Sequence, residues 1–247
     1  MIFYNHDKML VVVAHPDDEV LGIGGTLNKL SIESEIEIKV VILGEGLTSR
    51  AEKRNVDAFK TELEKHKENI TDAQNILGYH DISIYNLPDN RFDSIPLLDI
   101  IKIVEYEKMT FKPTIILTHH GGDLNIDHQR TFEAVMTASR PLSEETVSTI
   151  ITFETPSGTE WRAASDPKHF IPNYYFIINE ENIIAKIKAM ESYEFERRIY
   201  PHPRSPKALK IHAKRNGIIV GCEYAECFVI IRHIENKIAK PYLDVFL

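Results

Sequence analysis

Four side chains that can bind a cation or move a proton follow an apolar run near the start of the chain. The run, residues 9–14, leads directly into His15, Asp17, Asp18 and Glu19. One imidazole and three carboxylates are costly to hold so close together unless a cation lies among them. His15 and Asp18 are three residues apart, so their donor atoms could converge on one ion while Asp17 points elsewhere.

A second cluster of the same kind follows residues 114–118. This stretch, residues 119–128, contains three histidines and two aspartates. Taken singly, these residues have simpler explanations, because His15 could be a hydrogen-bonded residue at a strand end and Asp17 or Asp18 could cap a helix. Two such clusters, each before a predicted helix, favour an open His, Asp, His metal site of the kind typical of catalytic zinc. The same ligands also suit non-haem iron.

The elements that must position these clusters alternate regularly. Apolar runs rich in Val, Ile and Leu predict buried strands at residues 9–14, 37–43, 82–87 and 114–118. Amphipathic stretches predict helices at residues 56–77, with a stop at Gly78, and at residues 95–109 and 129–139. This alternation predicts an α/β fold with a doubly wound sheet, in which ligands bind at the carboxyl ends of the strands.

The last third of the chain differs in pattern, but no Gly/Ser-rich or Pro-rich linker precedes it, so we expect a single domain. Strands are expected at residues 148–153, 174–178 and 226–232, and helices at residues 181–196 and 205–216. Residues 155–172 show little periodicity, and loops of this length are usually lids or binding loops.

Composition excludes several classes of function. The chain has 247 residues, of which 43% are hydrophobic, and its 29 basic and 37 acidic residues give a formal charge of −8. This net negative charge does not favour binding to nucleic acid or to an anionic membrane surface. No apolar run approaches the ~20 residues that a membrane helix needs, and the first residues do not resemble a secretory signal. We therefore expect a cytoplasmic protein with a small-molecule partner.

The motifs resemble the LmbE/PIG-L family of zinc-dependent N-deacetylases. The resemblance rests on Ala-His-Pro-Asp-Asp-Glu at residues 14–19 and on Asp127-His128, and it extends to residues 43–50, 88–93, 122–128, 155–161 and 201–205. It covers nearly the whole chain. It implies a Rossmann-like, mostly parallel sheet in one domain over residues 1–247, and hydrolysis of an N-acetyl group on an amino sugar with release of acetate.

The resemblance also implies roles for single residues. By position, His15, Asp18 and His128 would bind one Zn²⁺ or another divalent metal. Asp17 would be the general base, since a carboxylate next to a metal ligand, but not itself bound, can take a proton from the attacking water. Asp127 would orient a histidine from outside the ligand set.

The chain departs from the commonest family pattern at Asn125. Many members have His-x-Asp-His in the second motif, where this chain has Asn125-Ile126-Asp127-His128. Because an amide cannot carry the proton, the general acid is open: Asp17 could serve both steps, or His202 or His120 could enter the site. We expect Asp17 to serve both steps and Asn125 to stabilise the oxyanion, a task worth about 3 kcal/mol for one donor.

Five further residues are candidates for substrate recognition. Arg50 follows the second strand and Asp89 and Arg91 follow the third, so all three could line the cleft or form surface ion pairs. Trp161 could stack on a pyranose ring or anchor its loop to the core. His202 lies between two prolines and could clamp the backbone or reach an active site, including that of a neighbouring subunit in a homo-oligomer.

Three functions are compatible with these residues. The expected one is zinc-dependent N-deacetylation of an N-acetylglucosamine-type sugar, free or carried on a nucleotide or small aglycone. Metal-dependent hydrolysis of a phosphoester would use the same carboxylates and Arg50. A non-catalytic sugar-binding subunit would account for Asn125, although such a protein has no need of Asp17.

Overall fold

The computed structural model describes residue 3 and residues 6–235, whose strands form one seven-stranded sheet in the order β3-β2-β1-β4-β5-β7-β6. The strands are β1 (Lys8–Val13), β2 (Glu37–Gly44), β3 (Asp81–Leu87), β4 (Ile115–His119), β5 (Thr149–Phe153), β6 (Tyr174–Ile178) and β7 (Tyr224–His233). Strands β1 to β5 pair in parallel, and β7 runs antiparallel to both of its neighbours. The predicted α/β class and mostly parallel sheet are confirmed.

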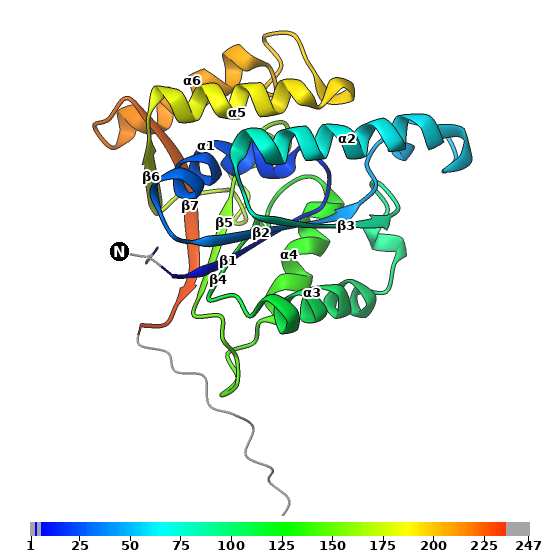
Figure 1. Ribbon diagram of the computed structural model, residues 1–247, viewed down its shortest axis with the longest axis horizontal. Coiled ribbons are helices and arrows are strands. Elements are labelled where there is room, and N and C mark those ends of the chain that lie inside the picture. Colours follow the sequence, from blue (N-terminus) through cyan, green and yellow to red (C-terminus); the bar gives the residue numbers. More distant parts are fainter. Residues whose placement is uncertain (1–2, 4–5, 236–247) are drawn as a thin grey trace, which may run out of the picture.

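In the described part of the chain, six α-helices cover the two faces of this sheet (Figure 1). They are α1 (Asp18–Glu33), α2 (Lys60–Leu77), α3 (Leu97–Phe111), α4 (Ile126–Ala138), α5 (Glu180–Ser192) and α6 (Pro206–Ile219). Helices α1, α2, α5 and α6 lie on one face, and α3 packs against α4 on the other. Within the described residues, no helix has the length and apolar character to cross a bilayer.

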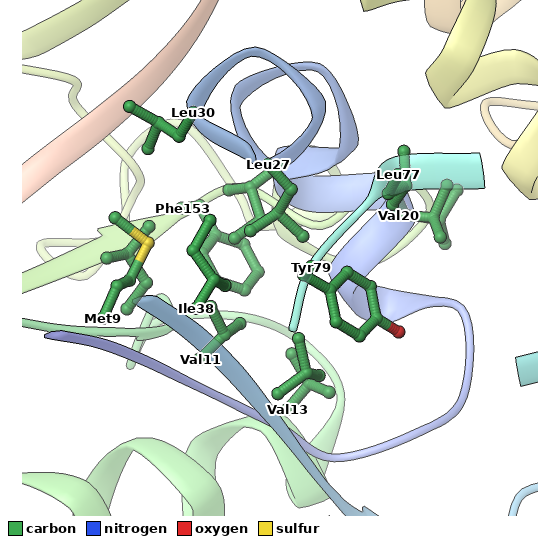
Figure 2. Close-up of a cluster of buried hydrophobic side chains, with 14 of the residues drawn as sticks. Met9, Val11, Val13, Val20, Leu27, Leu30, Ile38, Leu77, Tyr79 and Phe153 are labelled. Carbon is green, nitrogen blue, oxygen red and sulfur yellow. The ribbon is translucent and has the colours of Figure 1, made fainter. Parts of the chain in front are cut away.

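The core fills the space on both sides of β1. Figure 2 shows Met9, Val11 and Val13 of β1 facing Val20, Leu27 and Leu30 of α1, together with Ile38, Leu77, Tyr79 and Phe153. Leu10 and Val12 point to the opposite face and pack with residues of α3. Burial on both faces is what a central parallel strand requires, and it explains why residues 9–14 lack polar side chains.

Helix ends differ from the sequence prediction where the chain turns toward the carboxyl end of the sheet. The helix expected to end at residue 196 ends at Ser192, and a separate 3-10 turn covers Glu194–Glu196. Tyr193, between them, is fully buried and leaves the helical conformation. Tertiary packing of this aromatic ring overrides the local helical pattern.

Candidate metal centre and active site

Strands β1 and β4 lie side by side at the centre of the sheet, and the strand order reverses between them. In open α/β sheets, ligands bind in the crevice beyond such a reversal. His15 follows β1, His119 ends β4, and His128 lies in the first turn of α4. The two sequence clusters are therefore adjacent in space.

His15, Asp18 and His128 each offer one ligand atom, and the three atoms lie within 4.8 Å of one another. Asp18 Oδ2 is 3.3 Å from His15 Nδ1 and 3.3 Å from His128 Nε2. Neither ring nitrogen of His128 has a hydrogen-bond partner in the described structure, although the side chain is buried. A buried imidazole without partners beside a buried carboxylate and a second imidazole fits a divalent metal of the zinc type.

The charges in this group favour a cation. Burial would raise the pKa of Asp18, but His128 beside it holds the pKa well below its usual range. Burial would likewise lower the pKa of His128, yet Asp18 and Asp123 raise it to about 9. The site therefore stabilises an anionic Asp18 and places positive charge against it, which a metal would supply when bound.

Two aspartates orient the histidines. Asp127 Oδ2 lies 2.9 Å from His15 Nε2, and the same carboxylate accepts the backbone N–H groups of Asn90 and Phe92. Asp123 Oδ1 lies 3.2 Å from His128 Nδ1. Each carboxylate lies against the ring nitrogen that faces away from Asp18, an arrangement that would orient both histidines toward a metal held by Asp18.

His119 is buried at the same place but is engaged elsewhere. The Ala14 N–H donates to His119 Nε2 at 2.9 Å, so His119 Nδ1 carries the proton and donates to the Thr155 hydroxyl at 3.0 Å. Burial, reinforced by His128, lowers the pKa of His119 to about 4. His119 is therefore a neutral residue that joins β4 to the end of β1.

Asp17 lies outside the metal group. Its backbone is left-handed, with φ at 104°, and its N–H donates to Glu19 Oε2 at 3.2 Å. The Tyr193 hydroxyl donates to the other oxygen of Glu19 at 2.5 Å. Burial raises the pKa of the Asp17 carboxyl well above its usual range, and Arg204 opposes this shift.

Arg204 and Glu196 are site residues that the sequence analysis missed. Arg204 Nη1 donates to Asp17 Oδ2 at 2.9 Å and to Glu196 Oε2 at 2.8 Å. Glu196 also pairs with Arg50 and Arg198. The one available signal was the position of Arg204 beside His202, in a stretch already singled out, but no local pattern could pair it with Asp17.

A cavity of about 280 Å³ opens beside His15, the one member of the metal group in its lining; Asp18 and His128 are not part of that lining. Seven predicted site residues line it: His15, Asp17, Arg50, Asp89, Asn125, Trp161 and His202. Unpredicted lining residues include Ser49, His66, Asn90, Ser157, Glu196, Arg198 and Arg204. Arg91 is exposed and does not belong to the lining.

The candidate recognition residues already have protein partners. Arg50 donates to Glu196 and to the Phe195 carbonyl. Asp89 accepts the Ser49 hydroxyl at 2.6 Å. Trp161 is 56% exposed, and its ring meets that of His202 edge to face, so it remains available to a ligand.

Asn125 and His120, which were considered for the oxyanion and for the general acid, lie in different places. Asn125 is the N-cap of α4: its Oδ1 accepts the Asp127 N–H at 2.8 Å, and its Nδ2 donates to Asn90 Oδ1 at 3.1 Å. His120 lies outside the cavity lining, with Nε2 against the Lys168 carbonyl. Asn125 therefore faces the cavity while also holding the start of the helix that carries His128.

Comparisons with known proteins indicate the family of this chain. The family model described as PIG-L, GlcNAc-PI de-N-acetylase, matches residues 10–139. An uncharacterized deacetylase of Escherichia coli K12, YaiS, is 28% identical over 191 residues, which cover 75% of this chain and 90% of that protein.

Solved structures share the fold. The N,N'-diacetylchitobiose deacetylase of Pyrococcus horikoshii superposes with a TM-score of 0.71 at 20% identity, covering 92% of this chain and 84% of its own. The 4-carboxy-2-hydroxymuconate hydratase GalB of Pseudomonas putida superposes with a TM-score of 0.69 at 17% identity, covering 93% and 99%. Because a deacetylase and a hydratase share this fold, the reaction has to be argued from the site.

Proposed function

The chain belongs to the PIG-L family of de-N-acetylases, and we propose that it hydrolyses the N-acetyl group of an N-acetylglucosamine-type sugar or sugar conjugate, releasing acetate. The proposal rests on one observation, which is that two adjacent carboxylates lie in different surroundings. Asp18 belongs to the His15 and His128 group, whereas Asp17 lines the cavity. Metal-dependent hydrolysis of an amide uses both a ligand that holds the metal and a free base at the same place.

His15, Asp18 and His128 would hold one zinc ion or another divalent metal. When bound, the metal would polarise the amide carbonyl and make water more acidic. Asp127 and Asp123 keep both imidazole rings in the orientation that this requires.

Asp17 acts as the base and then as the acid. Water attacks the carbonyl carbon while Asp17 accepts its proton. The C–N bond then breaks, and Asp17 returns the proton to the amine nitrogen, so that acetate and the free amino sugar leave. Because Asn125 cannot carry a proton, one carboxyl that serves both steps needs no further acid.

Asn125 stabilises the oxyanion. Its Nδ2 group has two hydrogens, and one of them is donated to Asn90. The second is available for the carbonyl oxygen as negative charge develops on it. The helix cap made by Asn125 Oδ1 fixes the amide in that orientation.

The cavity suits a small polar ligand. At about 280 Å³ its size is appropriate for a sugar ring, and Arg50, Asp89, Trp161 and His202 supply polar groups and an aromatic face around it. We assign these four residues to sugar recognition.

The test is acetate release from a panel of N-acetylated amino sugars, free and nucleotide-linked, by metal-stripped protein with and without added zinc. Acetate that forms only with zinc is the expected result. Phosphate release from sugar phosphates would instead indicate a phosphoesterase. A sugar that binds to the zinc-loaded protein and is not consumed would indicate a binding subunit.

A further inference from the structure

Asp17 and Asp18 are neighbouring buried carboxylates, yet only Asp18 belongs to the metal group. We propose that Arg204 is a positioning residue that keeps the Asp17 carboxylate away from the metal and thereby preserves it as a free base. The importance of that base rests on the proposed function, whereas the separation of the two carboxylates can be tested on metal binding alone.

Arg204 is held by three acceptors from three parts of the chain. Its Nη1 donates to Asp17 Oδ2 at 2.9 Å and to Glu196 Oε2 at 2.8 Å, and its Nε donates to Ser157 Oγ at 2.6 Å. Ser205, the next residue, caps α6. The guanidinium is therefore fixed in place, and the Asp17 carboxylate must turn toward it to form their hydrogen bond.

The backbone of Asp17 is fixed independently. Its N–H donates to Glu19, and its carbonyl accepts the N–H groups of Val20 and Leu21 at 3.0 and 2.8 Å as α1 begins. A positive φ at a residue other than glycine is held only by such surrounding contacts. With the backbone held, side-chain rotation alone decides whether the carboxylate faces Arg204 or the metal group.

Removal of Arg204 would leave a buried carboxylate without a cation. An unpaired buried charge is strongly unfavourable, and the nearest compensating charge would be a divalent ion held by Asp18. Asp17 would then rotate and become an additional ligand. Metal binding would be tighter, and the base would be lost.

The experiment compares zinc affinity of wild type, Arg204→Met and Arg198→Met, measured by competition with a chromophoric chelator. Arg198 also lines the cavity and pairs with Glu196, at 3.4 Å, but has no bond to Asp17. We expect Arg204→Met to bind zinc roughly 10-fold more tightly, the size of effect that residues around metal ligands commonly have. Arg198→Met should match wild type.

Two further variants identify the cause. Adding Asp17→Asn to Arg204→Met should abolish the gain in affinity, because the amide is a poor replacement for a carboxylate ligand. Arg204→Lys keeps the positive charge and should bind zinc as wild type does. Arg204→Gln removes the charge but keeps a polar side chain, so it should show the same gain as Arg204→Met and replaces that variant if it fails to fold. Substitution with Co²⁺ should show weaker visible absorption in Arg204→Met, as a higher coordination number requires.

Zinc affinity that falls or stays constant in Arg204→Met, or a gain that persists with Asp17→Asn, would overturn the proposal. Failure of the proposed function would be separate from these results: wild-type protein with zinc would release no acetate, while the order of metal affinities among the variants would be unaffected.

Discussion

His119 and His128 lie face to face, with ring centroids 3.8 Å apart and ring planes within 6° of parallel, and of these two residues it is His128 whose ring nitrogens lack hydrogen-bond partners. His119 is hydrogen-bonded through both of its nitrogens. Two neighbouring imidazoles thus differ in their surroundings: His128 belongs to the proposed metal group, whereas His119 connects two strands.

His128→Gln should therefore lose bound zinc, whereas His119→Gln should keep it. We expect His119→Gln to lower the free energy of unfolding by about 1 to 3 kcal/mol, because the buried hydrogen bonds of the imidazole are only partly replaced. Metal analysis of the purified variants and denaturant unfolding check both points. Loss of zinc in both variants, with the fold intact, would make His119 a ligand.

Asp17→Asn should keep zinc but lose turnover by roughly 10²–10⁴-fold, the range typical of a missing general base. His15→Ala should lose the metal as well. The measurement is zinc content beside the rate of acetate release. If the two variants lost zinc to the same extent, Asp17 would have to be assigned as a ligand.

Two variants distinguish the two roles of Asn125, as the helix cap and as the oxyanion donor. Asn125→Ala should lower the free energy of unfolding by about 1 kcal/mol through loss of the helix cap, and Asn125→Asp should keep the capping oxygen. Both lack the amide donor, so both should slow the chemical step by an amount equivalent to about 3 kcal/mol. An unchanged rate in Asn125→Ala would exclude the oxyanion role.

His66 makes stability depend on pH. Burial, aided by Arg50, lowers the pKa of His66 to about 4, whereas the unfolded chain has an ordinary histidine with a pKa near 6.5. The unfolded state therefore binds the proton first as pH falls, and stability that is complete above pH 6.5 decreases toward pH 4, by about 3 kcal/mol for this group. Denaturant unfolding at several pH values should show that the free energy of unfolding falls less steeply with decreasing pH for His66→Gln than for wild type. Equal slopes would contradict the assignment.

Glu226 of β7 stabilises a break in α1. Ile23 departs from helical geometry, and Glu226 accepts the N–H groups of Gly25 and Thr26 at 3.1 and 2.7 Å. It also accepts the buried Lys186 ammonium at 2.6 Å. Glu226→Ala should lower the free energy of unfolding by about 3 to 5 kcal/mol, because it leaves Lys186 buried and unpaired.

Two variants serve as controls for Glu226. Changing Lys186 and Glu226 together to Met should recover part of the lost stability. Lys210→Met breaks an exposed pair with Glu180 and should cost less than about 1 kcal/mol. If Glu226→Ala cost no more than Lys210→Met, the proposed support of α1 would be wrong.

Local sequence determined the elements of the fold. Residues 174–178 were predicted as a strand and form β6, and Gly78, the predicted helix stop, follows α2 with φ at +83°. Hydrophobic periodicity and terminal glycines act within a few residues, so they can be recognised in the sequence without knowledge of the tertiary structure. The candidate ligands His15 and Asp18 are visible for the same reason, since one strand-to-helix turn carries both.

Tertiary structure decided which residues hold these groups in place. Arg204 meets Asp17 across 187 positions, and Tyr193 meets Glu19 across 174. The insertion of β7 between β5 and β6 places Glu226 against α1. Such pairings depend on how buried side chains fill the space between elements, and a linear pattern of residue types carries no information about which distant surfaces will pack together. The sequence by itself thus determined which groups are candidates for the chemistry, and packing decided that Asp17 meets Arg204 while Asp18 lies beside His15 and His128.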